Sequence, residues 1–216
     1  MFEIVRYTPD KAVEWNAFVA QSKNGTFLFD RGYMDYHADR FKDFSLMVYK
    51  DGNLYALFPA NIKGDVLTCH GGLTYGPLVM NRKCSAKGIQ ESFIVINLYL
   101  RASHVSRVIY KAIPWIYHQL PAEEDLYALT SVCHAQLIIR DISSTIVCDR
   151  KMPFSESRRS GIRKALRKRL IVKESSDFAV FWNILNDNLM TKYGIHPVHT
   201  AAELELLHAR FPDNIR

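Results

Sequence analysis

The sequence contains an internal repeat, because it matches itself at an offset of 167 residues. Ile4-Val5 falls on Ile171-Val172, and Trp15-Asn16 falls on Trp182-Asn183. Without a gap, seven of the thirteen positions from 4 to 16 are identical to their counterparts. Self-similarity at a fixed period is the signature of a repeated structural unit. Tryptophan is rare, so the matched Trp-Asn pair carries much of the weight, and we interpret the match as a duplication.

Each copy predicts a strand followed by two helices. The strands are expected at Ile4–Tyr7 and Ile171–Lys173. Thr8-Pro9 starts the first helix of one copy, and Ser175 or Ser176 with Asp177 starts that of the other, because these residues favour helix N-termini. The second helices are expected around Tyr33–Asp39 and Ala201–Arg210. The latter opens with Thr200-Ala-Ala-Glu203, which has the capping-box pattern.

The period places Arg216 opposite position 49, so the second copy stops about a third of the way through. Two complete copies need roughly 330 residues. We therefore expect a shortened chain with one complete domain at 1–148. Residues 149–216 are expected to hold a basic helix and then the first strand and two helices of an incomplete second domain.

The rest of the first copy predicts a run of strands followed by helices and strands in turn. Asp51-Gly52 is typical of a two-residue hairpin turn between two strands, and the region around Ser85–Ala102 has apolar residues at helical spacing. The expected elements after the first two helices are strands at 44–49, 54–61, 66–70 and 77–80, a helix at 85–102, a strand at 105–113, a helix from 121 to about 132, and a strand at 136–142. This order predicts an α/β fold with a mixed sheet.

The positive charge is concentrated in one segment. The whole chain has a net charge of +6. Arg150 to Lys173 holds ten Lys or Arg and only one acid, Glu156, so this segment is +9 and the remainder is −3. Such a patch attracts phosphates, nucleic acid or an anionic surface. The alternative interpretation is an ordinary solvated helix face.

The spacing within this segment predicts a short amphipathic helix. Ile162, Ala165, Leu166 and Arg169 follow the helical rule and form one narrow stripe. The neighbouring basic side chains fall off that stripe and are free to face solvent or a ligand. We take four of them as substrate-binding candidates, because they suit an anionic group: Arg158, Arg163, Lys164 and Lys168.

Three stretches carry a family resemblance: residues 24–33 (NGTFLFDRGY), residues 157–165 (SRRSGIRKA), and the Trp182 helix closed by Lys192-Tyr-Gly194. With the element order and the repeat, the chain resembles the Fem-type aminoacyltransferases and related bacterial proteins that carry two GNAT-like domains. The resemblance implies an α/β fold with a GNAT-like mixed sheet flanked by helices, followed by the start of a second GNAT-like domain.

The resemblance also implies a function, namely N-acyl transfer to an amine of a small molecule, a sugar or a cell-wall precursor. The donor is expected to be acetyl-CoA, another acyl-CoA or aminoacyl-tRNA, held in the part of the second copy beyond Arg216. Family members that bind nucleotide-sugar phosphates use a lysine where this chain has His37, which is therefore a further substrate-contact candidate. The family's Q/R-x-x-G-x-G/A donor loop is matched only in part, by Arg158-x-x-Gly161-x-Arg163. No catalytic residue is assigned.

Two other functions remain open. The chain is either a non-catalytic module that holds RNA or another polyanion, or an inactive shortened relative. The expected partners are an anionic donor or acceptor, with tRNA and a second copy of the chain as further candidates.

Composition and cysteine usage indicate a soluble, cytoplasmic globular protein. The chain is 48% hydrophobic and 23% charged, which excludes a disordered chain. No apolar stretch is long enough to span a bilayer. The four cysteines are far apart and form no CxxC pattern, so we expect free, mostly buried thiols. No metal site is expected, since His196-x-x-His199 lacks the HExxH pattern and neighbouring cysteines.

Overall fold

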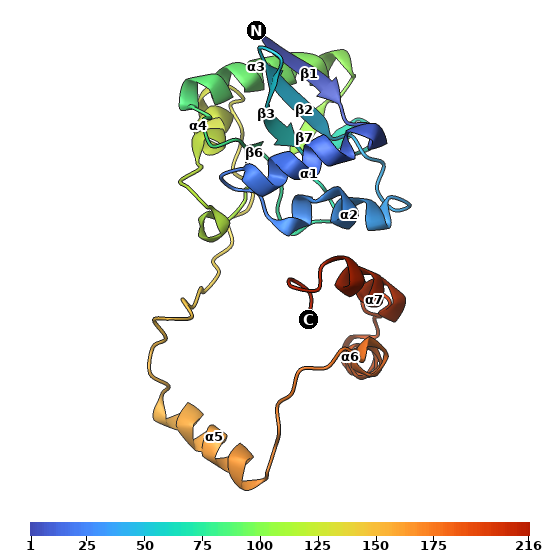
Figure 1. Ribbon diagram of the computed structural model, residues 1–216, viewed down its shortest axis with the longest axis vertical. Helices are drawn as coiled ribbons and strands as arrows, with labels where there is room; N and C mark the ends of the chain where they lie inside the picture. The colour runs from blue at the N-terminus through green and yellow to red at the C-terminus, as the bar shows by residue number, and fades with distance from the viewer. The chain divides into compact units, whose positions relative to one another are not determined.

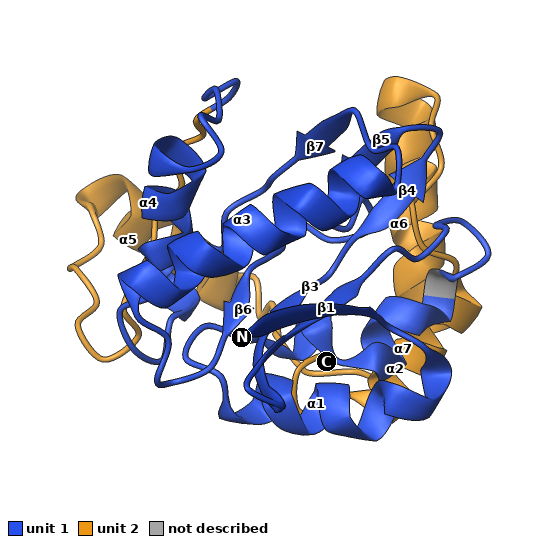
Figure 2. Ribbon diagram, turned by 90° about the horizontal axis from the view of Figure 1, so that it is seen from above, with its two compact units in different colours: residues 1–139 blue, residues 140–216 orange. Residues whose placement is uncertain are grey.

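The computed structural model describes the backbone of residues 1–216 and every side chain except that of His37. The chain divides into two compact units, residues 1–139 and residues 140–216 (Figure 2). The basic segment from Arg150 to Lys173 therefore falls entirely in the second unit.

The first unit combines strands and helices, as Figure 1 shows, and its strands β2 to β6 follow one another without a helix between them. Its elements in chain order are β1 (Phe2–Arg6), the 3-10 helix η1 (Pro9–Lys11), α1 (Ala12–Gln21), η2 (Phe27–Phe29), α2 (Arg31–Met34), η3 (Asp35–His37), β2 (Leu46–Lys50), β3 (Asn53–Phe58), β4 (Asn61–Lys63), β5 (Val66–Thr68), β6 (Val79–Met80), α3 (Ala86–Ala102), β7 (Arg107–Ile109), η4 (Trp115–Tyr117) and α4 (Glu124–Ser131).

The strands form two sheets. A four-stranded sheet has the order β1-β2-β3-β6, and all its neighbours are antiparallel. A three-stranded sheet has the order β4-β5-β7, in which β4 and β5 are antiparallel and β5 and β7 are parallel. The unit is therefore an α/β structure with one antiparallel sheet, one mixed sheet and flanking helices, which confirms the expected fold class.

Helices cover both faces of the four-stranded sheet. Figure 2 shows its strands between α3 on one side and α1 and α2 on the other. Successive residues of a strand point to opposite faces. Accordingly, Met47, Leu57 and Val79 join one apolar cluster with Trp15 and Phe29. The residues beside them join a second cluster with the buried side of α3, and these are Leu46, Val48, Ala56, Phe58 and Met80. Because both faces are covered, the central strands β2 and β3 consist mostly of apolar residues.

The structure confirms the predicted hairpin turn after β2 and the predicted helix after Ser85. Asp51 and Gly52 have φ values of 49° and 78° and connect β2 to β3, as a two-residue hairpin turn requires. Helix α3 begins after the N-cap Ser85, whose side chain accepts a hydrogen bond from the Gly88 amide. Its apolar face is buried, as the spacing predicted, through Ile89, Phe93, Ile96 and Leu100.

Two expected strands are absent from the described structure. Residues 136–142 and 171–173 have no regular secondary structure. Ile142 is 98% exposed and Val172 is 100% exposed. A strand needs a hydrogen-bonded neighbour, and among the described residues neither segment has one. The expected helix at Tyr33–Asp39 is also shorter, since α2 ends at Met34 and a 3-10 turn follows.

The second unit contains three helices: α5 (Glu156–Arg167), α6 (Phe178–Tyr193) and α7 (Ala201–Arg210). The predicted capping box at the start of α7 is present, because Thr200 and Glu203 each accept a hydrogen bond from the other's backbone amide. Gly194 ends α6 in the left-handed conformation, with φ of 67°. Phe178 and Leu207 are buried where α6 and α7 pack.

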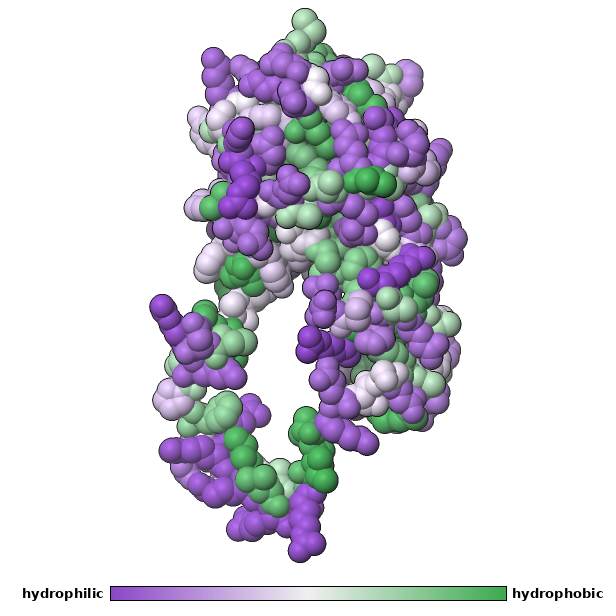
Figure 3. Space-filling model, in the orientation of Figure 1, coloured by the Kyte–Doolittle hydropathy of each residue, from purple (hydrophilic) through white to green (hydrophobic). Residues whose placement is uncertain are grey.

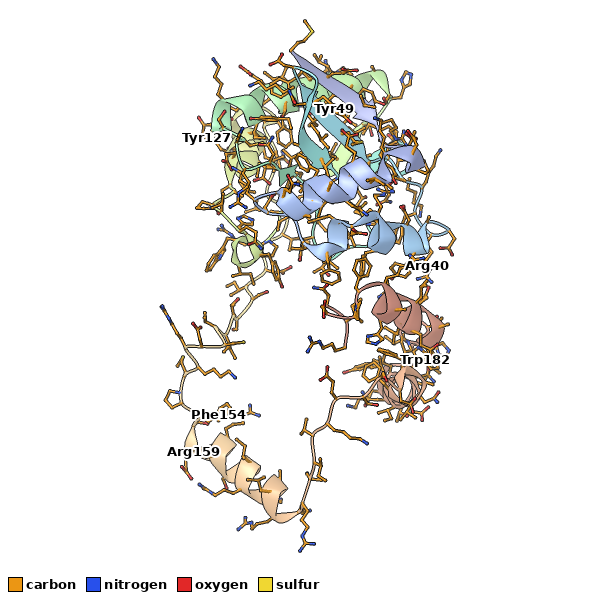
Figure 4. All side chains as sticks on the ribbon, in the orientation of Figure 1. Arg40, Tyr49, Tyr127, Phe154, Arg159 and Trp182 are labelled. Atoms are coloured by element: carbon orange, nitrogen blue, oxygen red, sulfur yellow. The ribbon has the colours of Figure 1, made fainter. Side chains whose placement is uncertain are left out.

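The tryptophans matched by the repeat make the same hydrogen bond in both units. The Trp15 Nε1 donates to the carbonyl oxygen of Phe29 at 2.7 Å, and Phe29 precedes Asp30, the N-cap of α2. The Trp182 Nε1 donates to the carbonyl oxygen of His199 at 2.7 Å, and His199 precedes the N-cap of α7 (Figure 4). Each tryptophan thus fixes its own helix to the start of the next one.

All four cysteines have free thiols, as expected. Cys69 and Cys84 are buried, Cys133 is half-buried and Cys148 is exposed, so burial applies to two of the four. Within the described chain, no helix combines the length and apolarity that crossing a lipid bilayer requires.

Candidate functional site

Helix α5 carries the basic residues singled out in the sequence. The Ser155 side chain accepts a hydrogen bond from the Arg158 amide, and Glu156 lies in the first turn, so the helix begins with a cap and an acid. It ends at Lys168, followed by Arg169 with φ of 55°. Every residue of α5 is exposed except Ala165, which is half-buried. Because residues 158–163 are helical, the partial match to the family's donor loop, Arg158-x-x-Gly161-x-Arg163, does not form a loop here.

One carboxylate serves two of the arginines. Glu156 lies 2.9 Å from the Arg159 guanidinium and 2.5 Å from that of Arg163. Arg163, one of the four candidates, is therefore held by an acid of its own helix. Among the described residues the other three, Arg158, Lys164 and Lys168, form no ion pair. Arg167, which was not a candidate, is exposed and forms no ion pair among the described residues either, so these four cations of α5 and its C-cap are available to an anionic ligand.

Arg158 borders an open hollow on the helix surface. The hollow has a volume of about 350 Å³ and is lined by Ser157, Arg158, Gly161, Ile162 and Ala165. Nothing lies within 4 Å of the position that a Gly161 Cβ would occupy. The hollow therefore brings a guanidinium, a hydroxyl and an apolar surface together. Lys164 and Lys168 do not line it, and the side chain of His37 lies outside the described residues.

A second basic region lies at the N-terminus of α3 and was missed in the sequence. Arg82, Lys83 and Lys87 are exposed around the N-cap Ser85. In the described part of the chain they form no ion pair. A helix N-terminus attracts anions because its first amides point outward without helical partners. The sequence does contain a signal for this region, because three cations surround a serine that can cap a helix. Its position at the edge of the sheet became clear only from the fold, in which α3 follows the edge strand β6.

The first turn of α3 packs closely on β3. The Tyr55 hydroxyl accepts a hydrogen bond from the Ser85 amide at 3.1 Å. A Cβ on Gly88 would lie 2.2 Å from that hydroxyl oxygen, so only glycine fits there. Tyr55 and Ser85 together satisfy two of the backbone amides at this helix start, those of Ser85 and Gly88.

A buried polar cluster fixes the start of α4. The Lys23 ammonium pairs with Glu124 and lies 3.4 Å from the carbonyl oxygen of Cys84. The Lys23 side chain is 4% exposed. The second oxygen of Glu124, Oε2, is buried and has no hydrogen-bond partner in the described chain. These groups lie 101 positions apart in the sequence, so no local pattern could pair them.

Asp125, the next residue, is also buried and ionisable. It pairs with the Tyr110 hydroxyl, which in turn accepts a hydrogen bond from the Leu78 amide at 2.7 Å. Desolvation raises the pKa of Asp125 from 3.8 to about 6 and raises the pKa of Tyr110 as well. The Tyr110–Asp125 pair ties α4 to the strand edges at β6 and β7. Because Asp125 is 3% exposed, we assign this pair a structural role.

Comparison with known proteins gives structural neighbours only. No family model matches the chain, and no curated protein matches it. Among solved structures, a ribosomal-protein-alanine N-acetyltransferase from Brucella melitensis is 15% identical, with a TM-score of 0.43, over 68% of this chain and 98% of that one. A glucosamine-6-phosphate N-acetyltransferase from Arabidopsis thaliana is 11% identical, with a TM-score of 0.39, over 68% and 99%.

A GNAT family acetyltransferase from Brucella melitensis, solved in complex with acetyl-CoA, is 15% identical with a TM-score of 0.32. It covers 49% of this chain and 71% of that chain. With such low identities and scores, the case for a function rests on this chain's own residues.

Proposed function

We propose that the protein is an N-acyltransferase of the GNAT type, which moves an acyl group from a thioester donor to an amine. The observation that carries the proposal is the first unit itself, in which α3 follows the edge strand β6 and opens among Arg82, Lys83 and Lys87. A helix N-terminus in a basic setting suits the pyrophosphate of an acyl-CoA. The sequence resemblance to Fem-type proteins supports the same reaction class.

The proposal gives the two basic regions separate tasks. The α3 N-terminus takes the diphosphate of an acyl-CoA donor, for which acetyl-CoA is the simplest choice. Aminoacyl-tRNA, the alternative donor, is an ester without a diphosphate, and the same amides and cations would contact its phosphodiesters. Arg158, Lys164 and Lys168 of α5 bind an anionic group of the donor or of the acceptor. The acceptor is an amine on a small molecule, a sugar or a cell-wall precursor. Transfer requires that both reactants are held in line and that the tetrahedral oxyanion is stabilised.

We further propose that residues 149–216 begin a second GNAT-like domain of the Fem-type tandem arrangement. Two features support this domain assignment. The repeat aligns Trp15 with Trp182, and both rings donate to the carbonyl that precedes the following helix. Sedimentation of the full chain tests whether the protein pairs with a second copy, the further partner expected from the sequence.

Titration calorimetry with acetyl-CoA tests the donor site. Binding is expected, and Arg82→Gln/Lys83→Gln should weaken it by about tenfold or more, because two cations facing a diphosphate are lost. Lys63→Gln/Arg101→Gln is the matched control, since it removes two exposed cations elsewhere in the first unit. Release of the CoA thiol in the presence of a panel of amines then tests transfer. If acetyl-CoA does not bind, or if both double variants weaken it equally, the assignment is wrong.

The second candidate function is a polyanion-binding module, favoured by the +9 charge of residues 150–173. Its signature is a linear fall of log affinity for single-stranded RNA with log salt concentration. Binding should be lost in Arg158→Ala/Arg163→Ala. Saturable binding of acetyl-CoA counts against this function as the protein's only one.

A further inference from the structure

The basic segment also exposes an unusual number of apolar side chains. Phe154 is 60% exposed, Leu166 is 66% exposed and Ile171 is 85% exposed. The full set of exposed large apolar residues in this segment is Met152, Phe154, Ile162, Leu166, Leu170, Ile171 and Val172. Figure 3 shows hydrophobic and hydrophilic residues side by side along this part of the chain. Seven such residues among 24 are more than a solvated charged helix needs.

The apolar side chains are arranged around a helix. Ile162 and Leu166 are four residues apart and therefore lie on one face of α5, with Ala165 beside them. Phe154 directly precedes the N-cap Ser155, and Leu170 to Val172 follow the last turn. The helix has twelve residues and is about 18 Å long. Apolar groups thus occur at both ends of the helix and along one side.

The cations of this segment are mostly unneutralised. Of its ten Lys and Arg residues, Arg159 and Arg163 share the single carboxylate of Glu156. Within the described part of the chain the other eight form no ion pair. The segment therefore presents a dense positive charge next to exposed apolar side chains. This combination complements a surface that is anionic outside and apolar just beneath.

We propose that residues 150–173 form a membrane-surface element that binds an anionic lipid bilayer. Helix α5 lies in the plane of the headgroups, its cations contact lipid phosphates, and Phe154, Ile162, Leu166 and Ile171 enter the acyl boundary. Amphipathic helices with a low overall hydrophobicity and many cations bind membranes in this way. The chain then lies on the membrane without crossing it, and the α5 cations assigned above to an anionic substrate group contact lipid phosphates instead while the helix is bound.

A lipid surface explains the observations better than RNA does. Phosphates of RNA match the cations, but they leave seven exposed apolar side chains in water. An aromatic ring can stack on a base, yet the segment offers only Phe154 for this purpose, and its other apolar residues are aliphatic. A bilayer interface accepts the cations and the aliphatic side chains together.

Sedimentation with vesicles tests the proposal on the full chain. The protein should pellet with vesicles of phosphatidylglycerol and phosphatidylcholine in equal parts and remain in solution with phosphatidylcholine alone. Lys151→Gln/Arg167→Gln should weaken binding about tenfold or more, because each cation near an anionic surface contributes. Leu166→Gln/Ile171→Gln should weaken it by a similar factor through lost insertion. Lys63→Gln/Arg101→Gln and Val13→Gln/Leu98→Gln are the matched controls at exposed positions of the first unit.

Insertion is tested separately from charge attraction. Phe154→Trp adds a reporter whose emission should shift to the blue on the anionic vesicles and should be quenched by brominated acyl chains, relative to the unsubstituted protein. Circular dichroism confirms that each variant keeps its helices. The proposal is overturned if the protein ignores anionic vesicles or if the leucine–isoleucine variant binds as well as the parent. It is also overturned if poly(U) RNA displaces the vesicles and binds that variant unchanged.

Discussion

Replacing Asp125 with asparagine should remove the pH dependence that this carboxyl imposes on the stability of the first unit. Asp125 is 3% exposed, and it interacts with the Tyr110 hydroxyl and with the Leu126 amide at 2.9 Å. Desolvation raises its pKa to about 6 from 3.8. Asparagine keeps the size of the side chain and one of its two acceptor oxygens, but it cannot ionise.

The sign and size of the effect follow from the two pKa values. Because the folded state holds the proton more tightly than the unfolded state, the stabilisation from this group is complete below the unfolded pKa of 3.8. It is lost as the pH rises through about 6. A shift of about two units corresponds to about 3 kcal/mol of unfolding free energy. The Asp125→Asn variant should therefore gain up to about 3 kcal/mol relative to the parent between about pH 4 and pH 7.

Urea unfolding of both proteins from about pH 4 to about pH 8 measures this difference. Glu123→Gln is the matched control, because it removes an exposed carboxylate two positions earlier at the start of the same helix. The reasoning fails if the difference between the Asp125→Asn variant and the parent stays constant with pH. It also fails if the variant loses stability relative to the parent as the pH rises.

Three further substitutions test local packing and capping, each by thermal or urea unfolding. Gly88→Ala should cost about 1–3 kcal/mol, because its Cβ meets the Tyr55 hydroxyl oxygen at 2.2 Å. Tyr55→Phe should recover part of that loss in the double variant, and no recovery would contradict the clash. Trp182→Phe should cost about 1 kcal/mol in the second unit, since it removes the donor to the His199 carbonyl. Thr200→Ala should cost about 1 kcal/mol by breaking the capping box, whereas Thr200→Asp should not.

The sequence was most informative where structure depends on neighbours along the chain. The hairpin at Asp51-Gly52, the buried face of α3 and the capping box at Thr200 are all present. Each depends on residues within a few positions of one another. A turn needs only the residues that adopt positive φ, and a capping box needs only two side chains and two amides.

The sequence was misleading where structure depends on distant partners. Residues 136–142 and 171–173 have the composition of strands, but no neighbouring strand pairs with them in the described chain. The polar groups of the candidate sites also divide into those visible in the sequence and those that only the fold brings together. The cations of α5 were visible as a charge cluster, whereas the cluster of Lys23, Glu124 and Cys84 exists only because the fold joins α4 to the start of α3.

The same reasoning explains which parts of the repeat keep their structure in the second unit. In the first unit β1 is held by antiparallel pairing with β2, and Ile4 lies opposite Val48. The counterpart of Ile4, Ile171, has no such neighbour and is 85% exposed. The helices α6 and α7 depend instead on contacts within the pair, including the Trp182 hydrogen bond. Local interactions are therefore enough to form the two helices of the repeat. Its strand forms only in the first unit, where a neighbouring strand pairs with it.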